Sequence, residues 1–185
     1  TLLKLREEGK VTHVGVCNCY LDELKLLGEA DFITSNQPMY NMLERKIEPD
    51  VMPWCRDNKV GILAYSPMHS GLLTGKVSQA WFESLPENDW RKHKTDHPVV
   101  SHLQTENGFS NFTSFQSELY DIAKVNSRTI GELAVAWVLR KNEVASAIVG
   151  ARKKGQIHQI CRASESPLLK EEEDRINKAL EIYFP

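Results

Sequence analysis

Short apolar runs alternate along the chain with segments in which apolar residues recur at helical spacing. Leu21, Leu24 and Leu27 fall on one side of a helix, whereas residues 60–66 form an almost continuous apolar run. We predict strands at 11–18, 32–37, 60–66 and 146–151. We predict helices at 21–30, 47–58, 115–126, 130–143, 153–164 and 170–184, with Pro49 in the first turn of the second and Thr129 capping the fourth. Such repeated units predict parallel strands covered by helices, either in a doubly wound sheet or in part of a (β/α) barrel.

The length of the chain bears on this choice. A complete (β/α)8 barrel needs about 250 residues, whereas this chain has 185 residues and four predicted strands. We therefore expect half of a barrel or a small open sheet. No G-x-G-x-x-G turn follows the first strand, which argues against a Rossmann unit. Residues 1–10 are expected to form the last turns of a helix that ends at Gly9, as if the chain began inside a longer fold.

A long segment between the third and fourth predicted strands interrupts the alternation. Residues 69–114 are rich in Pro, Asn, Asp, Gly and Ser, and a segment of this length is typically a functional loop or lid. We expect residues 1–185 to form one domain that contains this loop and ends in a helix at 170–184.

Composition and charge exclude several classes of function. The chain is 41% hydrophobic and 26% charged, and its net charge of -2 comes from interleaved acidic and basic residues, so we expect no nucleic-acid partner. No apolar run approaches the roughly 20 residues of a membrane-spanning helix. The first residues also lack the pattern of a signal peptide, so a cytoplasmic protein is expected.

Neither the cysteines nor the histidines predict a metal site. The four cysteines are scattered at Cys17, Cys19, Cys55 and Cys161. They lack C-x-x-C spacing, which favours reduced thiols. His93 and His97 have i, i+4 spacing but no third ligand beside them.

Polar or small residues follow all four predicted strands. They are Cys17-Asn18, Ser35-Asn36-Gln37, Tyr65-Ser66 and Gly150-Ala151-Arg152. In parallel α/β folds the carboxyl ends of the strands meet at one edge of the sheet, so we expect these groups to converge on a pocket. Taken singly, Tyr65 could simply pack as an aromatic residue, and Asn18 and Gln37 could be turn or cap residues.

Several stretches, in this order, resemble the C-terminal half of the aldo-keto reductase family. They are "EEGKVTHVGVCN", "SNQPMYNMLER", "GILAYSPMHSGLLTGK" and "LAVAWVLRKNEVASAIVGARKKGQI". The resemblance covers nearly the whole chain and implies units five to eight of a (β/α)8 barrel. It also implies that a nicotinamide cofactor, usually NADPH, lies across the carboxyl face of the barrel.

The resemblance implies a role for each polar group near the strand ends. At the nicotinamide end, Asn18, its neighbour Cys17 and Gln37 would bind the carboxamide while Tyr65 stacks on the ring. The pyrophosphate cradle would be formed by Ser66, Met68, Ser70 and Gly71, with Lys76 and Arg91 over the diphosphate. The 2′-phosphate and adenosine would be bound around Gly150, Arg152, Lys153, Lys154, Gln156 and Gln159.

Two kinds of departure from the family pattern stand out. Cys17 and Cys19 replace the family's usual Ser and aromatic residue, and Gln159-Ile160 replaces a common Glu-Asn pair near the adenine. The family's catalytic Asp, Tyr, Lys and His come from the first four strands, so no catalytic residue is assigned in this chain. The parent reaction would be hydride transfer from NADPH to a small-molecule carbonyl compound, and the isolated chain is expected to be inactive.

Two further interpretations stay open. The half-barrel could be a non-catalytic nucleotide-binding or assembly module, because unpaired sheet edges invite self-association or pairing with a missing N-terminal half. Alternatively, the chain could be a fragment of a complete enzyme.

Overall fold

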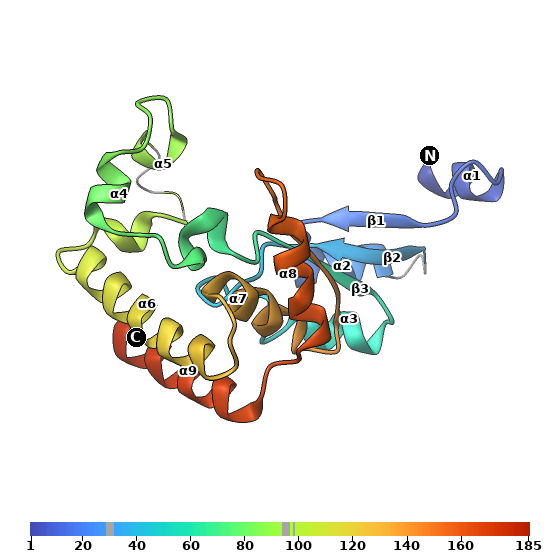
Figure 1. The fold of residues 1–185 in the computed structure, drawn as a ribbon. Helices are drawn as coiled ribbons and strands as arrows, with labels where there is room; N and C mark the ends of the chain where they lie inside the picture. Colours follow the sequence, from blue (N-terminus) through green and yellow to red (C-terminus); the bar gives the residue numbers. More distant parts are fainter. Residues whose placement is uncertain (29–31, 94–96, 98) are drawn as a thin grey trace. The chain divides into compact units, whose positions relative to one another are not determined.

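The chain forms two compact units, which are described in turn (Figure 1). The computed structural model describes residues 1–28, 32–93, 97 and 99–185. Unit 1 contains Thr1–Pro67 and Val138–Val149, and unit 2 contains Met68–Trp137 and Gly150–Pro185. The organisation of residues 1–185 as a single domain stays a prediction.

Unit 1 is built on a parallel sheet of four strands. They are β1 (Val14–Cys17), β2 (Ile33–Gln37), β3 (Gly61–Tyr65) and β4 (Val144–Ile148). The strands lie in sequence order, and every neighbouring pair is parallel. The predicted parallel α/β class is therefore confirmed. The fourth strand begins at Val144 and ends at Ile148, not at residues 146 and 151 as predicted.

The helices that lie wholly in the described part of unit 1 are α1 (Leu2–Glu7), α2 (Leu21–Gly28) and α3 (Val51–Asp57). Gly9 follows α1 with a φ of 69°, as a C-terminal glycine should. The end of the helix predicted at 21–30 lies outside the described residues. α3 begins later than predicted because the Asp50 carboxylate accepts a hydrogen bond from the N–H of Val51, so Pro49 precedes the helix.

Unit 2 contains most of the helices. They are η1 (His69–Thr74), α4 (Gln79–Glu83), α5 (Trp90–His93), η2 (Ser101–Gln104), α6 (Gly108–Val125), α8 (Gln156–Glu165) and α9 (Lys170–Tyr183). The predicted loop at 69–114 therefore contains short helices, with residues 94–96 and 98 outside the described part. α6 begins at Gly108 instead of residue 115. A Cβ atom at Gly108 would lie 2.5 Å from the carbonyl oxygens of His102 and Leu103, so the tight turn into α6 requires glycine.

α6 and α9 pack against each other in an antiparallel pair (Figure 1). Near the start of α6, the Asn111 amide donates to the carbonyl oxygen of Tyr183 at 3.4 Å. Just after the end of α6, the Asn126 amide donates to the Glu172 carboxylate at 2.8 Å. The predicted C-terminal helix at 170–184 corresponds to α9.

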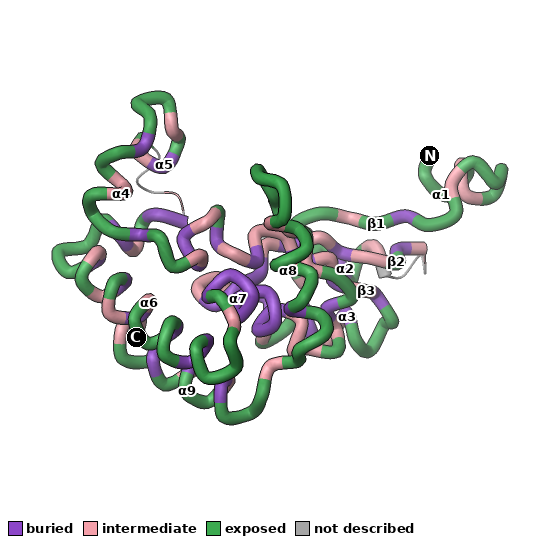
Figure 2. The backbone as a smooth tube through the Cα atoms, in the orientation of Figure 1, coloured by how far each residue is buried: buried purple, intermediate pink, exposed green. Residues whose placement is uncertain are grey.

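The remaining helix, α7 (Ile130–Leu139), runs from unit 2 into unit 1 and is buried along most of its length (Figure 2). Its start is capped as predicted, because the Thr129 hydroxyl accepts from the N–H of Glu132 at 3.2 Å. The Glu132 carboxylate in return accepts from the N–H and the hydroxyl of Thr129, at 2.8 and 2.6 Å. Its other oxygen accepts from Arg162 on α8, which joins the two helices.

Candidate functional site

The first two strands of unit 1 bring three of the predicted site residues together. Cys17 lies opposite Gln37 in the register of β1 and β2. The Cys17 thiol donates to the backbone oxygen of Gln37 at 3.2 Å, and the N–H of Asn18 donates to the same oxygen at 3.1 Å. Asn18 itself is exposed and has a φ of 54°. The carboxyl ends of β1 and β2 thus present a thiol and two amide side chains within one small area.

Tyr65 ends the neighbouring strand β3 and is half-buried. Its N–H donates to the carbonyl oxygen of Pro38 at 3.0 Å, and its own carbonyl oxygen accepts from the N–H of Tyr40 at 3.2 Å. Both contacts are made with the segment that follows β2. The structure therefore places Tyr65 beside the strand end that carries Gln37, as predicted, and Ser66 follows with a φ of 56°.

The predicted pyrophosphate loop follows Tyr65, and its residues from Met68 onward belong to unit 2. Left-handed φ angles follow one another at His69 (49°), Ser70 (53°) and Gly71 (92°). The Arg91 guanidinium donates to the carbonyl oxygen of Ser70 at 3.2 Å. Arg91 therefore fixes one side of this loop, whereas Lys76 lies exposed just after it.

Arg91 is buried and already bound to an acidic partner. It forms two hydrogen bonds to the Asp89 carboxylate, at 2.9 and 2.6 Å, and its guanidinium lies 5.1 Å from the centre of the Trp81 ring. The hydrogen bond from Arg91 lowers the pKa of Asp89 to about 2, so this ion pair stays charged at neutral pH. Its observed role is to anchor the loop, and its predicted contact with a diphosphate stays a prediction.

The segment before α8 differs in detail from the prediction. The Gln156 side-chain oxygen accepts from the backbone N–H groups of Arg152 and Lys153, at 2.7 and 2.8 Å. These two backbone amides are thus occupied, and the charged side chains of Arg152, Lys153 and Lys154 are the phosphate-binding candidates of this segment. Arg152, Lys153, Lys154 and Gln159 are all exposed. Gly150 has no left-handed φ; the left-handed glycine of this turn is Gly155, at 88°.

Two buried asparagines that sequence reasoning did not assign support the strand ends. Asn36 on β2 donates to the carbonyl oxygen of Cys19 at 2.9 Å and so holds the loop that carries Asn18. Asn41 donates to the carbonyl oxygen of Ser66 at 3.1 Å. The signal in the sequence was the density of amides in "SNQPMYN", but amides in such a stretch are also common in ordinary turns.

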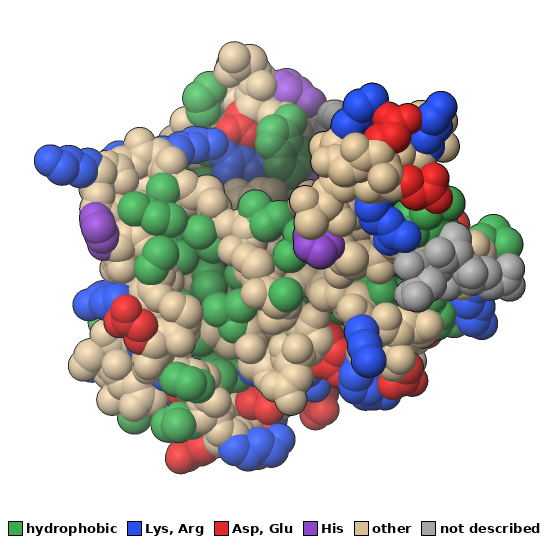
Figure 3. All heavy atoms as spheres, turned by 90° about the vertical axis from the view of Figure 1, so that its right-hand side faces the viewer, with side chains coloured by type: hydrophobic (Ala, Val, Ile, Leu, Met, Phe, Trp, Pro, Cys, Tyr) green, Lys and Arg blue, Asp and Glu red, His purple; other side chains and the backbone are tan. Residues whose placement is uncertain are grey.

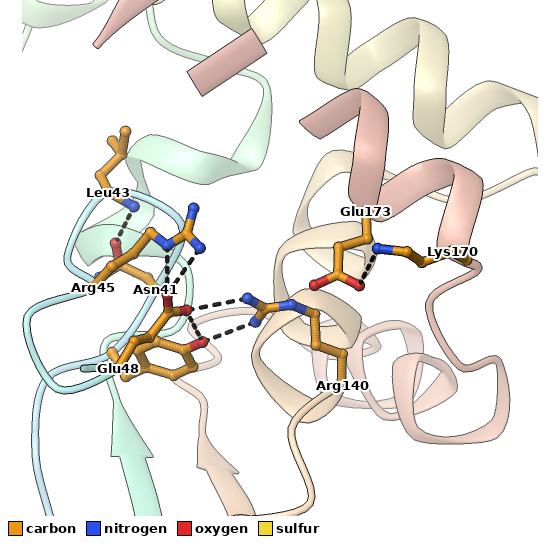
Figure 4. Close-up of polar contacts among 8 residues, drawn as sticks. Asn41, Leu43, Arg45, Glu48, Arg140, Lys170 and Glu173 are labelled. Atoms are coloured by element: carbon orange, nitrogen blue, oxygen red, sulfur yellow. Dashed lines mark hydrogen bonds and ion pairs between the residues drawn. The ribbon is translucent and has the colours of Figure 1, made fainter. Parts of the chain in front are cut away.

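A charged network lies next to these residues (Figure 4). The Glu48 carboxylate accepts from Arg45, from the Tyr40 hydroxyl at 2.6 Å and from Arg140 at 3.1 Å. Burial raises the pKa of Glu48, but the hydrogen bonds from Arg45, Tyr40 and Arg140 outweigh burial and lower it overall. Burial also raises the pKa of Tyr40, so its hydroxyl stays protonated. The network connects the segment after β2 to the residues that lead into β4.

The described residues also bear on metal binding, surface charge and membrane-spanning helices. Among the described residues, no three His, Cys, Asp or Glu side chains are placed to hold a metal ion. On the face drawn in Figure 3, basic side chains are interspersed with acidic ones. No helix in the described part of the chain combines the length and the hydropathy needed to cross a membrane.

Comparison with known proteins identifies relatives over nearly the whole chain. The model of the "Aldo/keto reductase family" matches residues 1–181. Aldo-keto reductase YhdN of Bacillus subtilis (strain 168) is 31% identical over 179 residues, which are 96% of this chain and 51% of that protein. The NADH-specific methylglyoxal reductase of Escherichia coli (strain K12) is 27% identical over 163 residues, 85% of this chain and 45% of that protein.

Among solved structures, the glycerol dehydrogenase AKR11B4 from Gluconobacter oxydans superposes with a TM-score of 0.87 and 28% identity. The superposition covers 100% of this chain and 53% of that one. The chain therefore spans about half the length of the relatives that it matches.

Proposed function

Because this chain belongs to the aldo/keto reductase family, we propose that it supplies the nicotinamide-nucleotide site of an oxidoreductase that reduces small-molecule carbonyl compounds. In this proposal the four strands are units five to eight of a (β/α)8 barrel, that is, its C-terminal half. The observation that carries the proposal is the grouping of Asn18, Gln37 and Tyr65 at the carboxyl ends of three adjacent parallel strands. In parallel α/β folds this is the edge at which ligands bind.

The residues of unit 1 suit the nicotinamide end of the nucleotide. A carboxamide needs both donors and acceptors, and the side-chain amides of Asn18 and Gln37 offer both. The Tyr65 ring supplies an aromatic face, and stacking of this kind is worth about 0.5–1.5 kcal/mol. These residues bind and orient the nucleotide, and the nicotinamide would supply the hydride.

The residues of the loop after β3 and of the segment before α8 suit the phosphates. In our proposal Ser66 and Met68 lead into the cradle that Ser70 and Gly71 form, and Arg91 keeps this loop in shape through the Ser70 carbonyl. Lys76 adds a positive charge beside it. The exposed cations Arg152 and Lys154 favour a 2′-phosphate and hence NADPH, with Gly150, Gln156 and Gln159 near the adenosine. The Escherichia coli relative is named NADH-specific, so the choice between NADPH and NADH needs a direct test.

The proposal assigns no catalytic residue to these 185 residues. Tyr65 is placed to stack and not to protonate, since its proposed partner is the ring of the cofactor. Protonation of the carbonyl oxygen needs a positioned acid, which in this family comes from units one to four. We therefore expect no carbonyl reduction by the isolated chain.

A second candidate function is assembly. β1 and β4 form the two edges of the sheet in the described part of the chain, and unpaired edges of parallel strands are templates for pairing. Either a second copy or an N-terminal half could complete the barrel at these edges.

One titration tests both candidates. The purified chain is titrated with NADPH, NADP⁺ and NADH while tryptophan fluorescence is followed, and the same samples are examined by analytical ultracentrifugation. We expect dissociation constants on the order of micromolar for NADPH, weakened about 2- to 12-fold by Tyr65→Ala. Tyr120→Ala, which removes an exposed tyrosine from α6, is the matched control.

The outcomes separate the candidates. Equal affinity for NADPH and NADH would contradict the role of Arg152 and Lys154, whereas binding unaffected by Tyr65→Ala would contradict the nicotinamide site. A chain that binds no nucleotide but dimerises would favour assembly. A monomer at every concentration would contradict self-association, and oxidation of NADPH by a reactive aldehyde would refute the expected lack of catalysis.

A further inference from the structure

Asn41 lies in the segment after β2, and its side chain is fully buried. Its Nδ2 atom donates to the carbonyl oxygen of Ser66 at 3.1 Å. Its Oδ1 atom accepts from the backbone N–H of Leu43 at 3.0 Å (Figure 4). It also accepts from the backbone N–H of Glu44 at 3.0 Å. The same amide therefore stabilises its own turn with the oxygen and reaches the end of β3 with the nitrogen.

The residue that Asn41 holds has an unusual backbone conformation. Ser66 has a φ of 56°, in the left-handed region that residues other than glycine rarely adopt. A hydrogen bond to its carbonyl oxygen favours the one orientation of the peptide group that points this oxygen at Asn41. The bond thus helps to hold a turn that serine by itself would disfavour.

Tyr65 precedes this turn and is tied to the same segment. Its N–H bonds to Pro38 and its carbonyl oxygen to the N–H of Tyr40. Residues 38–41 therefore hold both Tyr65 and Ser66, the first through the backbone and the second through the Asn41 side chain. The direction of the chain on either side of the Tyr65 ring is fixed by these contacts.

We infer that Asn41 is a positioning residue for the nicotinamide end of the nucleotide site. By holding the carbonyl of Ser66, it sets the turn from which the Tyr65 ring is presented. Asn41 is buried and acts through Ser66 without touching the nucleotide. The inference rests on the proposed function, because it assigns Tyr65 to nicotinamide stacking.

Substitution can test the donor and the acceptor atom of the Asn41 amide separately. Asn41→Asp keeps an acceptor for Leu43 and Glu44 but removes the donor to Ser66. Ser66→Gly allows the left-handed turn without help, because glycine adopts positive φ readily. Asn58→Asp is the matched control, since the exposed Asn58 amide also donates to a backbone oxygen, that of Trp54 at 2.9 Å.

The unsubstituted chain, Asn41→Asp, Ser66→Gly and the doubly substituted chain form a double-mutant cycle. Urea unfolding of these four chains tests the coupling between Asn41 and Ser66 without any nucleotide. We expect Asn41→Asp to raise the unfolding equilibrium constant about ten-fold, and Asn58→Asp to raise it about three-fold at most. The Ser66→Gly chain keeps the carbonyl that accepts from Asn41, and its glycine has no left-handed strain to release when this bond is lost, so Asn41→Asp should cost at least as much there. A smaller cost in the Ser66→Gly background would overturn the inference.

Ligand binding then separates positioning from stability. Asn41→Asp should weaken NADP⁺ binding by about three- to ten-fold and leave the binding of adenosine 2′,5′-bisphosphate, which lacks nicotinamide, within about two-fold. Ser66→Gly should reduce the loss for NADP⁺. Equal losses for both ligands would show a merely structural role and overturn the inference. If the unsubstituted chain bound neither ligand, the proposed function would fail and the positioning role with it, whereas the unfolding cycle would still report the coupling.

Discussion

Glu132 joins the start of α7 to α8, and replacing it by alanine tests which of its contacts stabilises the chain. The carboxylate is buried, and one oxygen accepts from both the N–H and the hydroxyl of Thr129 while the other accepts from Arg162. Glu132→Ala removes the half of the capping box in which the carboxylate accepts from Thr129, and hydrogen bonds to a charged group are worth about 1.5–3 kcal/mol. The Arg162 side chain is 61% exposed, so its ion pair contributes at most about 1 kcal/mol. We therefore expect Glu132→Ala to lower the free energy of unfolding by about 1–3 kcal/mol, mostly through the cap.

The comparison with two other variants makes the test specific. Glu132→Gln keeps an oxygen for Thr129 and should cost less than Glu132→Ala, and Arg162→Met, which breaks only the ion pair, should cost least. Urea unfolding followed by far-UV circular dichroism at neutral pH measures all three. If Arg162→Met cost as much as Glu132→Ala, the ion pair and not the cap would hold α7 to α8, and the reasoning would be refuted.

The same carboxylate predicts a dependence on pH. Burial raises the pKa of Glu132, but the hydrogen bonds from Thr129 and Arg162 outweigh it and lower the pKa below its ordinary value of 4.5. The contribution of Glu132 is therefore complete above pH 4.5 and is lost as the pH falls through the lowered value. The difference in stability between the native chain and Glu132→Gln should shrink in that acid range.

Two further predictions concern other positions. Burial, with a smaller effect of the neighbouring His102, lowers the pKa of His69 from 6.5 to about 3. Between pH 3 and pH 6.5 the His69 ring is therefore protonated in the unfolded chain but not in the folded one. The free energy of unfolding should thus fall by up to about 1.4 kcal/mol per pH unit below pH 6.5. Asparagine tolerates the left-handed φ of this position, so His69→Asn should flatten the slope measured by urea unfolding. An unchanged slope would contradict the assignment of this pH dependence to His69. A Cβ atom at Gly15 would overlap the Ser35 hydroxyl oxygen, so Gly15→Ala should cost about 1–3 kcal/mol in thermal unfolding. Ser35→Ala should relieve most of that cost, and no relief would show that the overlap is not its cause.

The sequence predicted those parts of the fold in which one local pattern dominates. The apolar run of β3 was found at nearly its observed bounds and α7 at its observed start, because neither element could be stable while exposed; α7 ends at Leu139, before the predicted residue 143. The segment at 69–114 was predicted as a loop because its composition is polar. Its helices are short and begin at local caps, such as Ser78, whose hydroxyl accepts from the N–H of Trp81. Periodicity cannot reveal an element of one or two turns.

The candidate site, like the fold, was predicted only in part. The placement of Tyr65 and Gln37 at one edge of the sheet could be predicted, because the carboxyl ends of parallel strands share an edge. Asn41 could not, because its partner Ser66 lies 25 residues further along the chain. The occupied amides of Arg152 and Lys153 were missed for a related reason. A glutamine side chain that reaches back to two N–H groups is a local choice that composition does not specify.

The sheet of unit 1 has connections of very unequal length, and this bears on how the chain folds. β2 and β3 are joined by residues 38–60, whereas β3 and β4 are joined by residues 66–143, although both pairs are neighbours in the sheet. Closing the longer connection costs about 1 kcal/mol more conformational entropy. Pairing across it is also slower, because contacts between distant residues form late. The first three strands can therefore assemble as soon as they are synthesised, whereas β4 can join them only after residues 66–143 have been synthesised.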